Sequence, residues 1–285
     1  MKTNKPAKLL ALLALAALLP ASATIITFYD FNDVNNLGWN GITADTSTAT
    51  WSSTGGLGGS GGVLSGGTGD RTRMITTQTT FDGSLGELSI GMFFNANSSN
   101  SSGDTDDRAS HIGFKDNNLA GQTRNADPGI RFDQADNAVS ARLASSGLGD
   151  NTNKQLDLFT IGDTARATSG EFFLEAGDWY FWSANFTPTS DGVWDLTTSI
   201  NTVDQTTFDI GSMVTGATVS ATGITGPTFA NFSEIWGGIA LAPDRTDRGT
   251  FNAIDNATIT AIPEPGTLVL VGIALGSLFL FRRRR

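Results

Sequence analysis

The feature that most limits the fold of this chain is the pattern of residues 24–262, where short apolar or alternating runs recur without any long helical period. The runs are separated by Gly, Asn, Asp, Ser and Pro, the residues that favour turns. About a dozen such runs without crossover helices predict one all-β domain, built as a sandwich of two antiparallel sheets. The clearest expected strands are 24–31, 88–95, 110–115, 129–133, 179–187, 193–200, 235–241 and 256–262, with weaker ones at 73–81, 138–143 and 156–161.

The composition excludes several classes of function. The 285 residues include no Cys, which rules out a disulfide framework, a thiol nucleophile and a Cys-ligated metal. The single His leaves one possible base for a Ser-His-Asp triad and no site with several His ligands. Residues 24–262 carry 11 basic and 27 acidic side chains, a net charge of −16. This charge argues against nucleic acid as a partner, because phosphate binding needs a basic surface.

Residues 1–23 have the three parts of a secretory signal peptide. A lysine-rich start precedes an apolar stretch at residues 9–19, which is too short to span a bilayer. Pro20 then breaks the helix, and Ala-Ser-Ala at residues 21–23 supplies the small residues of a cleavage site. We therefore expect export through the Sec pathway, with signal peptidase as a partner and a mature chain that begins near Thr24.

Residues 263–285 contain a second signal with three parts. A Pro-Glu-Pro motif precedes an apolar segment, residues 266–281, which is just long enough for a transmembrane helix if the first flanking Arg snorkels. Four arginines follow and predict a cytoplasmic C-terminus with the body of the protein outside. An ordinary membrane anchor that is never cut is the alternative interpretation. The motif and its basic flank consist of Pro263, Glu264, Pro265, Arg282, Arg283, Arg284 and Arg285.

The order of Pro-Glu-Pro, apolar helix and terminal arginines resembles the PEP-CTERM sorting signal of Gram-negative bacteria. The resemblance implies recognition by an exosortase, a membrane-embedded protease that cuts at or near the Pro-Glu-Pro motif. It also implies a protein that is anchored in the inner membrane by its C-terminus and then reaches the cell surface or the extracellular matrix. Members of the family are associated with extracellular polysaccharide and biofilm matrix, so polysaccharide is an expected partner.

A series of short motifs in residues 24–262 resembles the concanavalin A-like (laminin-G-like) jelly roll. In that family a Gly-x-Trp-Tyr motif opens a central strand, and an Ile-Asp-Asn strand closes the domain beside the first strand. The family includes lectins, glucanases and structural modules, so the fold leaves the function open. The matching segments are YDFND at 29–33, LSIGMFF at 88–94, LEAGDWYFW at 174–182 and AIDNATI at 253–259.

Asp30, Asp33 and Asp255 form a candidate metal site. If the first and last strands are neighbours, these carboxylates meet at one sheet edge, where oxygen ligands suit a structural calcium ion. The resemblance supports this hypothesis, because related carbohydrate-binding sandwiches hold calcium near their terminal strands. The alternative is that Asp255 and Asn256 only hydrogen-bond a turn. A second acidic cluster, residues 104–107, does not fit the spacing of an EF-hand loop and predicts a solvated loop.

Four consecutive aromatic residues, Trp179 to Trp182, place rings on both faces of one strand. One face packs between the sheets. If Tyr180 and Trp182 form the opposite, exposed pair, sugar rings could stack on them. The alternative is a central strand whose second face is covered by long loops.

The sequence lacks the pattern of a glycan hydrolase. Glycoside hydrolysis needs two carboxylates about 5–9.5 Å apart, and glucanases of this fold supply them from a Glu-x-Asp-x-x-Glu strand that is absent here. We interpret Glu171 and Glu175 as edge charges and His111 as a strand residue. The Gly-rich stretch at 56–61 matches a dinucleotide-binding pattern, but no helix can start after it, so it predicts a flexible loop.

The sequence therefore predicts a non-catalytic exported protein of the cell surface or the extracellular matrix. A lectin-like carbohydrate-binding module is the alternative, and a glycan hydrolase is the least expected function. Structural calcium is the one cofactor that the sequence suggests.

Overall fold

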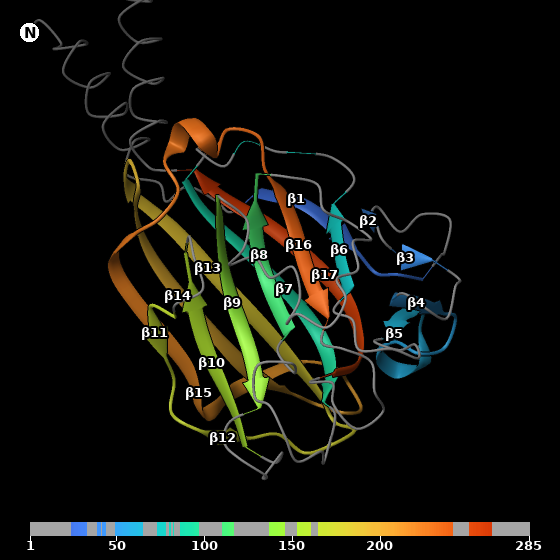
Figure 1. Ribbon diagram of the computed structural model, residues 1–285. Helices are drawn as coiled ribbons and strands as arrows, with labels where there is room; N and C mark the ends of the chain where they lie inside the picture. The colour runs from blue at the N-terminus through green and yellow to red at the C-terminus, as the bar shows by residue number, and fades with distance from the viewer. Residues whose placement is uncertain are drawn as a thin grey trace, which may run out of the picture.

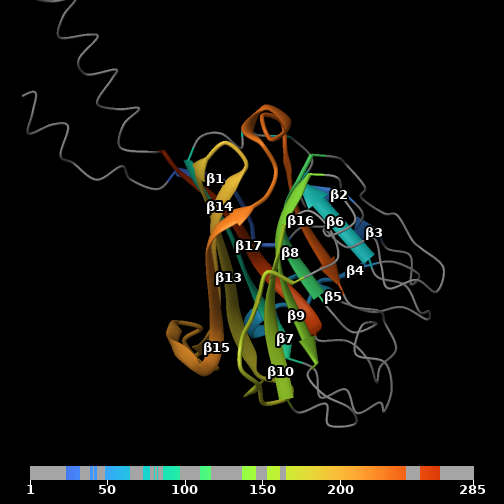
Figure 2. The same cartoon turned by 60° about the vertical axis from the view of Figure 1, so that its left-hand side comes forward.

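The computed structural model is an all-β protein in which two sheets pack face to face (Figure 1). Seen from the side, β13, β14, β15 and β17 lie in one layer, and β8, β9, β10 and β16 lie in the other (Figure 2). The predicted two-sheet sandwich is thereby confirmed. The structure describes residues 24–32, 39–40, 42–43, 49–64, 73–77, 80, 82, 86–96, 110–116, 137–145, 153–160, 165–241 and 251–263.

The first sheet contains nine of the described strands. Its neighbouring strands pair antiparallel, except for the short parallel pair of β3 and β4. A one-turn 3-10 helix, Leu57–Gly59, connects β4 to β5. In order across the sheet, the strands are β15 (Ile210–Thr225), β14 (Val193–Val203), β13 (Trp179–Ser190), β7 (Gly86–Ala96), β17 (Phe251–Pro263), β5 (Gly62–Leu64), β4 (Ala49–Ser52) and β3 (Ile42–Thr43), while β1 (Thr24–Tyr29) also pairs with β17.

The second sheet contains eight of the described strands. A second short 3-10 helix, Phe229–Asn231, precedes β16. In order, the strands are β11 (Ala167–Thr168), β10 (Asn153–Phe159), β9 (Ala138–Ser145), β8 (Ser110–Lys115), β16 (Trp236–Leu241), β6 (Arg73–Thr77) and β2 (Trp39–Asn40), while β12 (Phe172–Phe173) also pairs with β10.

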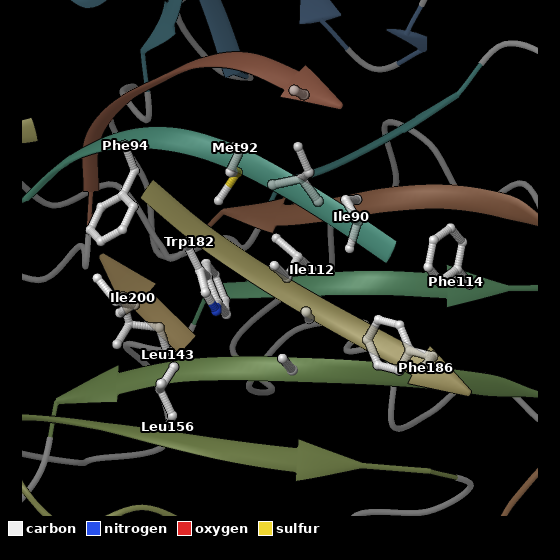
Figure 3. Packing of buried hydrophobic residues seen from close by; sticks show 14 of the residues in the cluster. Ile90, Met92, Phe94, Ile112, Phe114, Leu143, Leu156, Trp182, Phe186 and Ile200 are labelled. Carbon is white, nitrogen blue, oxygen red and sulfur yellow. The ribbon is translucent and has the colours of Figure 1, made fainter. Parts of the chain in front are cut away.

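Apolar side chains from both sheets fill the space between the layers (Figure 3). Met92 and Phe94 of β7 and Ile112 of β8 are fully buried there. Phe114 of β8 meets Phe186 of β13 edge-on, with ring centroids 5.5 Å apart. Since strand side chains alternate between faces, each central strand of the first sheet sends every second residue into this core and the others to the outer face.

The first and last described strands are neighbours, as the resemblance to the concanavalin A-like jelly roll implies. Strand β1 lies antiparallel to β17, with Thr24 opposite Ala261 and Tyr29 opposite Ala257. Strand β17 pairs on its other side with β7 over most of its length. The two ends of the described chain, Thr24 and Pro263, therefore lie close together at one corner of the sandwich (Figure 1).

Several expectations fall outside the part of the chain that the structure describes. They are the signal peptide at 1–23, the strand at 129–133 and the membrane helix at 266–281. Among the residues that the structure does describe, no helix has the length and apolar character needed to cross a bilayer.

Candidate functional site

The aromatic strand β13 has the opposite orientation from the one that the sequence suggested. Trp182 is fully buried and Tyr180 is 7% exposed, and both belong to the core between the sheets. The alternate residues Trp179 and Phe181 are the ones that face outward, and both are half-buried. The prediction that Tyr180 and Trp182 are exposed for sugar stacking is therefore wrong.

Polar contacts inside the sandwich explain this orientation. The Trp182 indole Nε1 donates a hydrogen bond to Thr198 Oγ1 on β14 at 2.8 Å. The backbone N–H of Glu175 donates to the Tyr180 hydroxyl at 2.9 Å, and burial raises the pKa of that hydroxyl. A buried indole or phenol needs a hydrogen-bonding partner for its polar atom, and this register provides one for both rings.

An aromatic pair lies on the outer face of the first sheet. Phe181 of β13 and Phe93 of β7 are cross-strand partners whose rings meet edge-on, with centroids 5.1 Å apart. Gly91 leaves room for this arrangement, because a Cβ atom added at that position would lie 2.7 Å from the Phe181 ring. Both rings are half-buried and keep part of their surface open to solvent.

Side-chain amides hold the end of the sheet next to these rings. Asn252 Nδ2 donates to Asn95 Oδ1 at 2.8 Å, and Asn95 Nδ2 donates to the Gly177 carbonyl at 2.5 Å. Gln205 Nε2 donates to the Trp179 carbonyl, and the Trp179 N–H donates to Gln205 Oε1, each at 3.0 Å. The outward-facing aromatic residues therefore lie beside exposed amide groups.

Hydroxyl and amide side chains dominate the rest of the outer face of the central strands. Ser183 and Ser199 approach each other at 3.5 Å across β13 and β14, and Ser89 hydrogen-bonds Thr260 across β7 and β17. The outward positions of these strands include three acids: Glu87, which accepts a hydrogen bond from Thr187, Asp195, and Asp255, which is buried. The described outer face is thus largely uncharged, although the domain as a whole is strongly acidic. We call the outward side chains of β7, β13, β14 and β17 the polar face.

The Gly-rich loop, residues 53–61, folds against the polar face at β17. Asp255, the cross-strand partner of Phe93, is fully buried beneath this loop. Its Oδ2 atom accepts hydrogen bonds from the Leu57 N–H and the Ser60 hydroxyl, each at 2.8 Å. The loop also packs against the turn that follows β14. A Cβ atom added at Gly58 would lie 2.6 Å from the Phe208 ring. The loop predicted to be flexible is therefore anchored to β17 through Asp255.

The surroundings of Asp255 do not fit a calcium ligand. In addition to its two bonds from the loop, its Oδ1 atom accepts the N–H of Asn256 at 2.7 Å. These groups present hydrogens to the carboxylate, whereas a cation needs further oxygen ligands. Burial raises the pKa of Asp255, the three hydrogen bonds lower it, and nearby Asp30 raises it further.

The other proposed ligands give no additional support for a metal. Asp30 is exposed and accepts the N–H of Asn32 at 3.2 Å. Asp33 and the acidic residues 104–107 lie outside the described residues. Within the ranges that the structure describes, no three His, Asp or Glu side chains gather where they could hold a metal ion. The alternative, that Asp255 and Asn256 hydrogen-bond a turn, matches the observed contacts.

We therefore expect no stabilisation by calcium through Asp255. The change in melting temperature between calcium and chelator, at equal ionic strength, should be the same in the purified exported protein and in Asp255→Asn, because the Asp255 carboxylate already has its hydrogen-bond donors. Differential scanning calorimetry measures this directly. A rise in melting temperature with calcium that disappears in Asp255→Asn would contradict the assignment.

The two glutamates considered for hydrolysis do not form a site. Glu171 and Glu175 are both exposed, and Glu171 Oε2 accepts a hydrogen bond from Asn153 at 3.1 Å. His111 of β8 is 1% exposed, and its ring lies 5.9 Å from that of Phe159. These positions match the interpretation of the glutamates as edge charges and of His111 as a strand residue.

A charged cluster on the second sheet was not predicted from the sequence. Arg142 of β9 lies between His111 and Asp157 in the cross-strand register, and its Nη2 lies 2.6 Å from Asp157 Oδ2. The guanidinium also lies over the Phe159 ring, 4.9 Å from its centroid. The side chain of Asp157 is 3% exposed and that of Arg142 is 16% exposed, so this pair offers little surface to a ligand.

The comparisons with known proteins identify a sorting motif and a fold. The family described as the PEP-CTERM protein-sorting motif matches residues 261–285, so the chain carries that motif. The match begins inside β17 and covers the predicted sorting signal at 263–285. A search among curated proteins finds no sequence that matches.

Solved structures of plant lectins share the fold of the described domain. Lectin II from Ulex europaeus has a TM-score of 0.53 and 9% identity, over 84% of this chain and 99% of the lectin. Peanut lectin with a nine-residue peptide has a TM-score of 0.52 and 8% identity, over 84% and 97% of the two chains. Winged bean acidic lectin complexed with methyl-α-D-galactose has a TM-score of 0.52 and 10% identity, over 84% and 98%. The predicted concanavalin A-like jelly roll is confirmed, and at these identities the likeness concerns the fold alone.

Proposed function

We propose that this chain is a non-catalytic exported protein of the cell surface or extracellular matrix of a Gram-negative bacterium, and that its polar face binds a neutral polysaccharide. The sorting motif implies a surface protein that is processed by an exosortase. In this proposal, residues 1–23 direct Sec export and are removed by signal peptidase. Residues 266–281 then hold the chain in the inner membrane until processing.

The polar face carries the binding part of the proposal. A sugar ring has an apolar C–H face, which can stack on a partly exposed aromatic ring, and hydroxyl groups at its edge, which can hydrogen-bond to amide and hydroxyl side chains. Phe93 and Phe181 supply the rings, and half-buried Asn95 and exposed Asn252 supply amide groups beside them. The uncharged character of this face favours a neutral chain, because an anionic polysaccharide would be repelled by the net charge of −16 that residues 24–262 carry. The lectins of the same fold support the proposal at the level of fold only.

The non-catalytic part of the proposal is supported by the placement of the carboxylates. Glu171 and Glu175 lie in solvent outside the polar face. Asp255, which lies beside Phe93, is buried beneath the Gly-rich loop and holds that loop in place. Turnover on a panel of polysaccharides that is lost in Glu171→Gln would contradict this part.

The binding prediction concerns Phe181. We expect Phe181→Ala to weaken binding of the exported protein to the neutral exopolysaccharide of its host up to about tenfold, since aromatic contacts contribute about 0.5–1.5 kcal/mol. Affinity electrophoresis with that polysaccharide, and with alginate as an anionic comparison, measures the change.

A matched control separates binding from folding. Phe173→Ala removes an exposed ring of the same kind from β12 of the second sheet, outside the polar face, so it should retain the affinity. Melting temperatures of both variants should stay near that of the parent protein. Equal binding by Phe181→Ala, or tighter binding to alginate than to the neutral polymer, would remove the polar face as the binding site.

A further inference from the structure

The sorting motif begins inside a strand of the folded domain. Strand β17 extends to Pro263, the first residue of the Pro-Glu-Pro motif. On one side Ile262 faces Glu87 and Pro263 faces Gly86 of β7. On the other side Ala261 faces Thr24 of β1. The chain therefore passes from a paired strand into the motif without any spacer.

The pairing restricts access to the chain just before the motif. An enzyme that recognises an extended peptide does so through main-chain hydrogen bonds, as a strand added to a sheet. At Ala261 both edges of β17 already face a neighbouring strand, and the side chain is 2% exposed beside Leu88 in the core. While these pairs persist, a protease in the membrane cannot bind the segment through Pro263 in extended form.

The same end of the strand has features that allow it to open. Pro263 has no N–H group and cannot donate a hydrogen bond to the ladder. Its partner Gly86 is the first residue of β7 and has a φ of +123°. Strand ends open with much lower free energies than the core of a domain, so the last residues of β17 can separate while the sandwich stays folded.

We propose that removal of the C-terminal tail requires the end of β17, residues 261–263, to separate from β1 and β7, so that this corner of the sandwich gates processing by the sorting protease. The inference rests on the proposed sorting function and adds a structural control to it. Thr24, the residue at which the mature chain is predicted to begin, lies opposite Ala261, so pairing of β1 helps to keep the end of β17 closed.

Two variants of the full chain test the gate: one frees the motif from the sheet, and the other holds the end of β17 against β1. A ten-residue Gly/Ser spacer between Ile262 and Pro263 keeps the motif intact and moves it away from the sheet. The double variant Thr24→Cys with Ala261→Cys allows a disulfide across the facing pair, and the natural chain has no other Cys to compete. The control is the same spacer in the exposed turn between Thr206 and Thr207.

Pulse-labelling in a host that carries an exosortase, with intact mass of the product, measures the rate of tail removal. We expect the spacer to accelerate removal about tenfold, which corresponds to an opening free energy of about 1.4 kcal/mol. We expect the disulfide to slow removal by a similar factor relative to Ala261→Cys alone. The control insertion should match the parent chain.

Equal rates in the spacer variant, the disulfide variant and the parent would overturn the gate and leave the sorting function intact. A tail that persists in every variant, the spacer variant included, would overturn the sorting function and the gate together. Melting temperatures of the purified variants establish that each has folded.

Discussion

Replacing Trp182 by Ala is expected to lower the free energy of unfolding by about 3–5 kcal/mol, the usual cost of removing a large buried aromatic side chain. Trp182 is fully buried in the centre of the core, and its indole donates to Thr198 Oγ1 at 2.8 Å. The substitution therefore leaves a cavity between the sheets and a buried hydroxyl that has lost its donor. Urea unfolding followed by circular dichroism measures the loss.

Phe181→Ala is the matched control for this prediction, because Phe181 neighbours Trp182 on β13 but faces outward. Its ring is half-buried, so the expected loss is about 1 kcal/mol. Trp182→Ala should therefore mainly lower the free energy of unfolding, whereas Phe181→Ala should mainly weaken polysaccharide binding. Similar losses of stability in the two would mean that the register of β13 is not the one described.

Asp255→Ala is expected to lower the free energy of unfolding by about 2–4 kcal/mol, because it leaves buried donors without an acceptor. The Leu57 N–H and the Ser60 hydroxyl both lose the carboxylate that ties the Gly-rich loop to β17. The exposed carboxylate of Asp209 is a suitable control, and Asp209→Ala should leave stability nearly unchanged. Chemical unfolding at neutral pH compares the three proteins, and equal stability of Asp255→Ala and the parent would show that the loop does not depend on this anchor.

The contribution of Asp255 also depends on pH in a definite direction. Burial raises its pKa in the folded protein above the ordinary value of 3.8, so the folded state holds this proton more tightly than the unfolded chain does. The resulting stabilisation is complete below pH 3.8 and is lost as the pH rises through the raised pKa. The stability of the parent protein relative to Asp255→Asn should therefore fall across that window and then level off.

How well the sequence predicts a strand depends on how the strand is buried. The alternation of β13 and β14 and the apolar content of β8 are visible in the sequence, because these strands pack against the core. Strand β15, Ile210–Thr225, was missed although it is the longest of the described strands. It lies at the edge of the sheet and is exposed along most of its length, so burial imposes no apolar alternation on it.

The orientation of β13 in the candidate site also depends on what its sequence shows. The aromatic cluster of β13 is visible in the sequence, but four consecutive aromatic residues satisfy both possible orientations of a strand. The residues that follow resolve the choice, because Ala184 and Phe186 share a face with Tyr180 and Trp182. The alternate positions carry the polar residues Ser183 and Asn185. The contacts of Trp182 with Thr198 and of Tyr180 with Glu175 confirm that the apolar face is the one toward the core.

The sequence by itself determined the sorting motif and the all-β class, because local order and alternation along the chain encode these features. The neighbouring positions of the first and last strands were implied only by the resemblance to the jelly-roll family. Tertiary structure alone decided that Phe93 and Phe181 form the outward pair, that Asp255 anchors a loop about 200 residues away in sequence, and that the sorting motif starts within a paired strand. The reason is physical: each of these depends on the register between strands that are distant in the chain, and register is fixed only when the two sheets pack together.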